Sequence, residues 1–197
     1  SLSRESSAST IQAATLRMNP TLAGWRPCDS AAAFVAWQMA VEHKTTPTAL
    51  ILTRQNLAHQ PRDAAQLAAI RKGGYVLKDC AGTPKAVIIA TGSEVALAVA
   101  AQAALAEKGV PVRVVSMPSN FMFDQQDAAY RKSVLPCGIP RVAVEAGVTE
   151  GWYKYVGLEG KVIGIDRFGE CGPANQVFEF LGITAAKVAE AVAQVIR

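Results

Sequence analysis

KAVIIATGSEVALAVAAQAALAEKGVPVRVVSMP, residues 85–118, is the stretch that decides the fold of this chain. Its residues 86–90 form a short apolar run rich in β-branched side chains, which is typical of a strand buried on both faces. Residues 94–108 are Ala-rich like a helix, which Gly109 and Pro111 would end. Residues 112–116 form a second apolar run. A strand, a helix and a strand in this order predict a right-handed crossover, and therefore a parallel sheet covered by helices on both faces.

Elements of the same kind are expected on either side of this unit. Asp29 stands at the N-cap position of a helix over residues 30–43, and a buried strand is expected at residues 48–53. This partial α/β unit has too few strands to close a sheet of its own. Further strands are expected at residues 75–78, 141–145 and 161–165, and helices at residues 124–132, capped by Asp124, and 185–196, capped by Thr184.

The two ends of the partial unit have different characters. Residues 1–15 begin with the polar, aperiodic segment SLSRESSAST, for which we expect a disordered or altered terminus. The polar residues 61–74, which begin at Pro61 and end at Gly73 and Gly74, predict a linker between two domains.

Composition excludes several classes of protein. The 197 residues carry a net charge of +4, but the basic residues are scattered, so we expect no nucleic-acid partner. No apolar run approaches the roughly 20 residues that span a bilayer, so no membrane association is expected. The four cysteines lie far apart without a C-x-x-C pair, which predicts a reduced, cytoplasmic protein without a metal site.

The turn Thr91-Gly92-Ser93-Glu94 has the spacing of a capping box, with Thr91 three residues before Glu94. The free N–H groups at such a helix start can also bind a phosphate or another anion. These four residues are therefore a candidate anion site, although capping alone would explain them.

Two charged residues follow expected buried strands. Arg54 lies at the carboxyl end of one strand, where ligands of open α/β sheets gather and where a guanidinium suits phosphate binding. A structural ion pair is the alternative. Glu145 follows another strand and could act as a base, bond backbone amides or meet a subunit partner.

Several segments of this chain together resemble transketolase. They occur in the family's order from about Leu16 to the end, and are WRPCD, TALILTRQNL, GGYVLKDC, IATGSEV, RVVSMPS, FDQQDAAYRKSVLP, VAVEAG, GWYKYVG and IDRFGECGP. The resemblance implies that residues 16–60 are the tail of the pyrimidine-binding domain. Residues 75–197 would be the complete C-terminal domain, a three-layer α/β/α sandwich with a mixed, mostly parallel five-stranded sheet.

The resemblance also implies a function. Transketolases are homodimers that use thiamine diphosphate and a divalent metal, Mg²⁺ or Ca²⁺, to transfer two-carbon ketol units between sugar phosphates in the pentose phosphate pathway. Arg54 matches the arginine that holds the substrate phosphate. The family's catalytic, cofactor-binding and metal-binding residues lie upstream of Ser1, so this chain is expected to carry no catalytic residue and to bind no cofactor or metal.

The expected function is therefore that of the C-terminal part of a transketolase, inactive on its own. Alternatives are part of a relative such as dihydroxyacetone synthase, a regulatory module that binds an anion at residues 91–94, and a structural module that braces a dimer.

Overall fold

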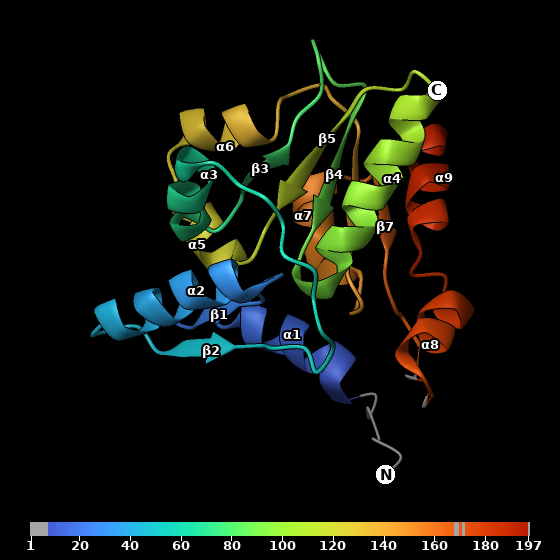
Figure 1. Ribbon diagram of the computed structural model, residues 1–197. Coiled ribbons are helices and arrows are strands. Elements are labelled where there is room, and N and C mark those ends of the chain that lie inside the picture. Colours follow the sequence, from blue (N-terminus) through green and yellow to red (C-terminus); the bar gives the residue numbers. More distant parts are fainter. Residues whose placement is uncertain (1–7, 168–169, 171, 197) are drawn as a thin grey trace.

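The protein is described by a computed structural model over residues 8–167, 170 and 172–196, and a five-stranded sheet lies at its centre (Figure 1). Its strand order is β3-β5-β4-β6-β7, with β3 antiparallel to β5 and the other neighbours parallel. A second, two-stranded sheet consists of β1 and β2. The strands of the two sheets are β1 (Ala23–Trp25), β2 (Thr48–Leu50), β3 (Tyr75–Lys78), β4 (Ala86–Ala90), β5 (Val112–Ser116), β6 (Arg141–Val144) and β7 (Lys161–Ile163). The mixed, mostly parallel sheet is confirmed.

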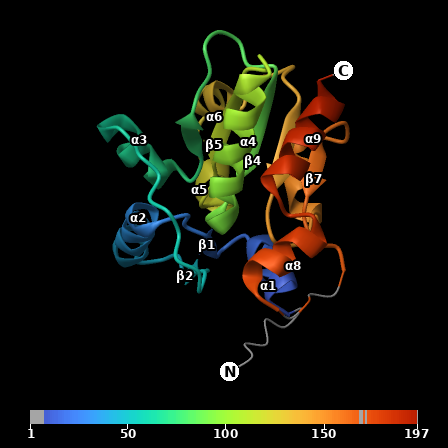
Figure 2. The ribbon, with the colours of Figure 1, turned by 45° about the vertical axis from the view of Figure 1, so that its right-hand side comes forward.

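Helices cover both faces of this sheet (Figures 1 and 2). The helices of the described residues, including those of the N-terminal unit, are α1 (Ala8–Met18), α2 (Ser30–Glu42), α3 (Ala64–Ala69), α4 (Val95–Glu107), α5 (Asn120–Asp124), α6 (Ala128–Val134), α7 (Tyr153–Val156), α8 (Ala174–Leu181) and α9 (Ala185–Val195), with the 3-10 turns η1 (Ile70–Lys72), η2 (Gly92–Glu94) and η3 (Glu150–Trp152).

The central strand β4 divides the core into two apolar layers. All five of its residues are buried, and their side chains alternate between the faces as strand geometry requires. Ile88 packs in the layer that contains α4 and α9, whereas Val87 and Ile89 pack in the layer that contains α5, α6 and α7. The expected three-layer sandwich is thereby confirmed.

A smaller N-terminal unit, formed by α1, β1, α2 and β2, lies across the end of the sheet where β4 and β6 finish (Figure 2). Its two strands are parallel, and backbone hydrogen bonds join it to the larger sheet. The Arg26 N–H donates to the Pro118 carbonyl at 2.7 Å, and the Gly92 N–H donates to the Arg26 carbonyl at 3.1 Å. The chain after β1 therefore docks directly on the turns that follow β4 and β5.

The described part of the expected disordered terminus, residues 8–15, is helical and belongs to α1, while residues 1–7 lie outside the described residues. The strand expected at residues 48–53 ends at Leu50, and that expected at 161–165 ends at Ile163.

The helix expected at residues 124–132 with Asp124 as its cap was wrong. Asp124 ends α5, and the next helix, α6, begins after Asp127, whose carboxylate accepts a hydrogen bond from the Tyr130 N–H at 2.7 Å. Two carboxylates three residues apart are both plausible caps, and only the backbone shows which one is used.

The expected linker contains α3 and η1 and is anchored by a buried ion pair. Asp29 caps α2 as expected, accepting from the Ala32 N–H at 3.0 Å. The same carboxylate accepts from the Gln60 N–H at 2.9 Å and from Arg62 at 2.7 Å. The side chains of Asp29 and Arg62 are 1% and 0% exposed, so this pair fixes the chain that leaves the N-terminal unit.

No helix in the ranges that the structure describes is long and apolar enough to cross a membrane. Cys28, Cys80 and Cys137 are free thiols, and Cys171 lies outside the described residues.

Asp29→Ala should lower the free energy of unfolding by about 3–5 kcal/mol, because it leaves the Arg62 guanidinium buried without its carboxylate. Asp63→Ala is the matched control, since Asp63 caps α3 in a capping box but is exposed. It should cost only about 1 kcal/mol. Urea unfolding of the two variants measures the difference, and equal losses would show that the Arg62 pair contributes nothing beyond capping.

Candidate functional site

Arg54 lies on the exposed segment that follows β2, at the carboxyl side of that strand. Within the part of the chain that the structure describes, its guanidinium has no hydrogen-bond or ion-pair partner. The structural ion pair considered as an alternative is therefore not formed with any described residue. An exposed guanidinium that no carboxylate neutralises is available to an anionic ligand.

The residues after Arg54 line a groove of about 730 Å³. One wall is formed by residues 55–58, a second by Ser93 and the first turn of α4, and a third by α8 and the start of α9. The structure thus brings the segment of Arg54 close to one residue of the predicted anion site, Ser93, although the two segments are distant in sequence.

Residues 91–94 do not form the expected capping box. The Thr91 hydroxyl donates to the Arg26 carbonyl at 3.2 Å, and no side chain caps the 3-10 turn that precedes α4. The Glu94 carboxylate is fully buried and pairs with the Arg26 guanidinium. It also accepts from the Ser93 hydroxyl and, at 2.9 Å, from the Ala146 N–H. The capping box was wrong because a charged partner from another part of the chain takes the carboxylate away from its own helix.

Gly92 in this turn is required by both its backbone and its neighbour. Its φ is +56°, a conformation that disfavours other residues. A Cβ atom there would lie 2.8 Å from Arg26 Nε. The small residue therefore lets the arginine lie against the turn.

Glu145 completes a buried charge cluster with Glu94, Arg26 and Arg17. The Glu145 side chain is 2% exposed, and Arg17 of α1 donates to its two oxygens at 2.6 and 2.7 Å. Arg26 donates to it at 3.3 Å, and the Trp152 indole N–H donates at 2.7 Å. The partners of Glu145 are thus side chains, two of them from the N-terminal unit.

The electrostatics of the cluster favour the charged forms of Glu145 and Arg26. Burial raises the pKa of Glu145, but Arg17, Arg26 and the Trp152 N–H outweigh it and hold that pKa below its usual value. Burial likewise lowers the pKa of Arg26, but the two carboxylates overcome this and raise it. A carboxylate with a lowered pKa and four hydrogen bonds is poorly suited to accept a proton as a base.

Residues 73–184 match the model of the transketolase-like C-terminal domain, and residues 5–60 match that of the transketolase pyrimidine-binding domain. The chain belongs to the transketolase family.

Individual transketolases are similar over most of this chain. Transketolase 1 of Vibrio cholerae is 56% identical over 178 residues, which are 90% of this chain and 27% of that protein. The transketolase structure from Leishmania mexicana has a TM-score of 0.87 at 39% identity, with 93% of this chain and 26% of that chain covered. A Pichia stipitis transketolase in complex with sedoheptulose 7-phosphate has a TM-score of 0.86 at 38% identity, with the same two coverages. The chain thus spans about a quarter of the length of these relatives and corresponds to the C-terminal part of a transketolase.

Among the residues described, no group of three or more His, Cys, Asp or Glu side chains could hold a metal ion.

Sequence reasoning missed Arg17 and Arg26 although a signal for them exists. Glu94 and Glu145 follow β4 and β6, which are neighbouring parallel strands, so their carboxylates meet at one edge of the sheet. Two buried carboxylates side by side require cations. Arg26 in the segment WRPCD was a candidate for such a cation. It lies 68 residues from Glu94 in the sequence, so no local pattern indicates that the two side chains pair.

Removing the charge of Arg17 should show that the cluster holds the two parts of the chain together. Arg17→Met keeps an unbranched aliphatic side chain but removes the guanidinium, whose central carbon lies 5.4 Å from the centre of the Trp152 ring. It should lower the free energy of unfolding by about 3 kcal/mol because Glu145 loses its bidentate partner. In a double-mutant cycle with Glu145→Gln, the coupling should be about 2 kcal/mol.

The exposed pair of Arg71 and Glu42, with side chains 39% and 44% exposed, supplies the control cycle. Its coupling should lie below about 1 kcal/mol. If the Arg17 and Glu145 substitutions are merely additive in urea unfolding, the cluster is not the joint between the two parts.

Proposed function

We propose that this chain forms the substrate-phosphate-binding and structural part of a thiamine-diphosphate-dependent transketolase, which moves two-carbon ketol units between sugar phosphates. Family membership supports the activity, and the sedoheptulose 7-phosphate complex of the Pichia stipitis enzyme supports a sugar phosphate as substrate. The observation that carries the role of this chain is Arg54, an exposed guanidinium without a described partner at the carboxyl side of β2.

In this proposal Arg54 acts by binding and orientation. A guanidinium can donate two parallel hydrogen bonds to phosphate oxygens, and these fix the phosphate end of the sugar. The phosphate is remote from the carbons that react, so most of this binding is equal in the ground state and the transition state. Arg54 should therefore affect the KM for substrate more than the turnover.

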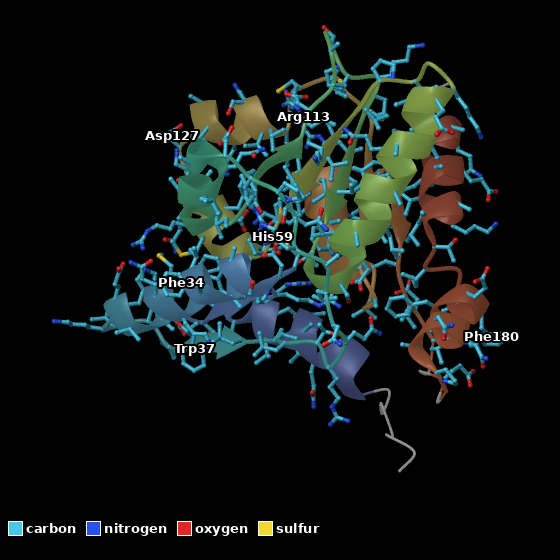
Figure 3. The ribbon with its side chains drawn as sticks, viewed as in Figure 1. Phe34, Trp37, His59, Arg113, Asp127 and Phe180 are labelled. Carbon is cyan, nitrogen blue, oxygen red and sulfur yellow. The ribbon has the colours of Figure 1, made fainter. Side chains whose placement is uncertain are left out.

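The complete enzyme is proposed to be a homodimer whose remaining pyrimidine-binding domain covers an apolar face of α2. Phe34, Trp37 and Val41 lie at helical spacing on this face and are 71%, 58% and 77% exposed (Figure 3). The neighbouring sheet has only two parallel strands, an arrangement that normally occurs within a larger covered sheet.

The three free thiols support a reducing, cytoplasmic location.

The role of Arg54 can be tested in a chimera in which the upstream part of Vibrio cholerae transketolase 1 is joined to this chain. The chimera should transfer ketol units from xylulose 5-phosphate to ribose 5-phosphate, whereas the 197-residue chain alone should not. Arg54→Ala in the chimera should raise the KM for sugar phosphates about tenfold to a hundredfold, the value of a charge-assisted hydrogen bond. Arg54→Lys should recover part of this loss.

Hydroxypyruvate serves as the control donor because it carries no phosphate. Its donor half-reaction should be nearly unaffected by Arg54→Ala. A comparable loss with hydroxypyruvate would mean that Arg54 supports the fold or the cofactor and would exclude the phosphate role.

The covering of α2 can be followed by fluorescence. Of the three tryptophans, Trp25 and Trp152 are each 1% exposed, so acrylamide should quench mainly Trp37 in the chain alone. In the chimera this quenching should fall, because the added part of the domain buries Trp37. Trp37→Phe identifies the signal in both proteins. Undiminished quenching of Trp37 in an active chimera would refute the proposed covering.

A further inference from the structure

A small pocket opens on the face of the sheet that α5, α6 and α7 cover. It encloses about 240 Å³ and lies between the end of α5, the side of α6, the start of β6 and α7. Its charged lining residues are Asp124, Arg131, Lys132, Arg141 and Lys154. The pocket lies at the amino end of β6, opposite to the end that carries Glu145, so it is separate from the groove beside Arg54.

The charges of this pocket do not balance. Four of the lining side chains are cationic and one is a carboxylate. Asp124 is already bonded to the Lys154 ammonium at 2.6 Å and to the Tyr155 hydroxyl at 2.9 Å. Arg131 and Lys132 are exposed, and neither forms an ion pair with another residue of the described ranges. The lining therefore has an excess of positive charge that the protein does not compensate.

One of these cations, the Arg141 guanidinium, is held in a fixed position by hydrogen bonds. Its guanidinium donates to three backbone carbonyls, to Tyr155 at 2.7 Å, to Leu135 at 3.0 Å and to Pro136 at 3.1 Å. These bonds hold the group in place, but they bring no negative charge to it. Burial lowers the pKa of Arg141 below its usual value. A partly buried cation that has only neutral acceptors is stabilised when an anion binds next to it.

We propose that this pocket binds a compact anion that carries phosphate groups, held by Arg131, Lys132, Arg141 and Lys154. The volume lies below the roughly 300–1,000 Å³ of pockets for drug-sized ligands, which favours a small polyanion. The alternative is that Arg131 and Lys132, in the last turn of α6, only interact favourably with the negative end of the helix dipole. That role would stabilise α6 without any binding at the pocket.

Pyrophosphate is the probe, titrated by calorimetry into the 197-residue chain at constant ionic strength. We expect saturable binding at one site. Arg131→Ala should weaken it about tenfold, the loss of one charge-assisted hydrogen bond. Asp124→Asn should instead tighten it, because it removes the only carboxylate of the lining and frees Lys154. The control is Lys187→Ala on α9, which also removes one positive charge but on the opposite face of the sheet. It should leave the affinity for pyrophosphate unchanged.

A local measurement places the anion in the pocket. Cys137 lines the pocket and is exposed, so iodoacetamide should alkylate it more slowly when pyrophosphate is bound. Cys80, outside the pocket, should react at the same rate with and without the anion, as peptide mass spectrometry would show. The proposal fails if no saturable binding occurs, if Lys187→Ala weakens binding as much as Arg131→Ala, or if Cys137 is not protected.

Discussion

The buried cluster of Arg17, Arg26, Glu94 and Glu145 is the interaction on which the arrangement of this chain depends. Two carboxylates emerge from neighbouring strands and lie out of water, where an unpaired charge is strongly unfavourable. Among the described residues, the cations that pair with them are Arg17 and Arg26, and both come from the N-terminal unit. The sheet is therefore electrostatically complete only when that unit is docked on it.

The cluster also changes how the edge of the sheet can be used. β4 lies between β5 and β6, so the crevice outside the carboxyl ends of β4 and β6 is the place where open α/β sheets usually bind ligands. Here the guanidinium groups of the neighbouring unit lie in that position. The anion site predicted at residues 91–94 stays a prediction. The Glu94 carboxylate of this turn already forms an ion pair with Arg26. Arg54 is an exposed cation at this end of the molecule, and it lies farther out on the irregular segment after β2.

The parts of the fold that depend on local sequence were predictable, and those that depend on distant partners were not. The strands and the helix of residues 85–118 followed from apolar runs and breakers, and the N-cap at Asp29 followed from one residue before an apolar segment. The spacing of Thr91 and Glu94 suggested a capping box equally well, yet Arg26 takes the Glu94 carboxylate. Local patterns cannot register a partner 68 residues away. Arg54 was predictable from its place at the carboxyl end of an expected strand and from its resemblance to a family motif, whereas its exposure and its lack of a described partner required the structure.

The buried ion pairs that hold the parts of this protein together are balanced in charge, whereas its candidate binding positions are not. In the cluster between the two parts of the chain, two guanidinium groups meet two carboxylates, and the energy of burial is offset within the protein. The same balance holds at Asp29 and Arg62, which are both buried. The cations Arg54, Arg131, Lys132 and Arg141 lack such a counterpart among the described residues. A partly buried cation such as Arg141, which its three backbone carbonyls hold in a fixed position, is stabilised further when an anion supplied from outside the chain binds beside it.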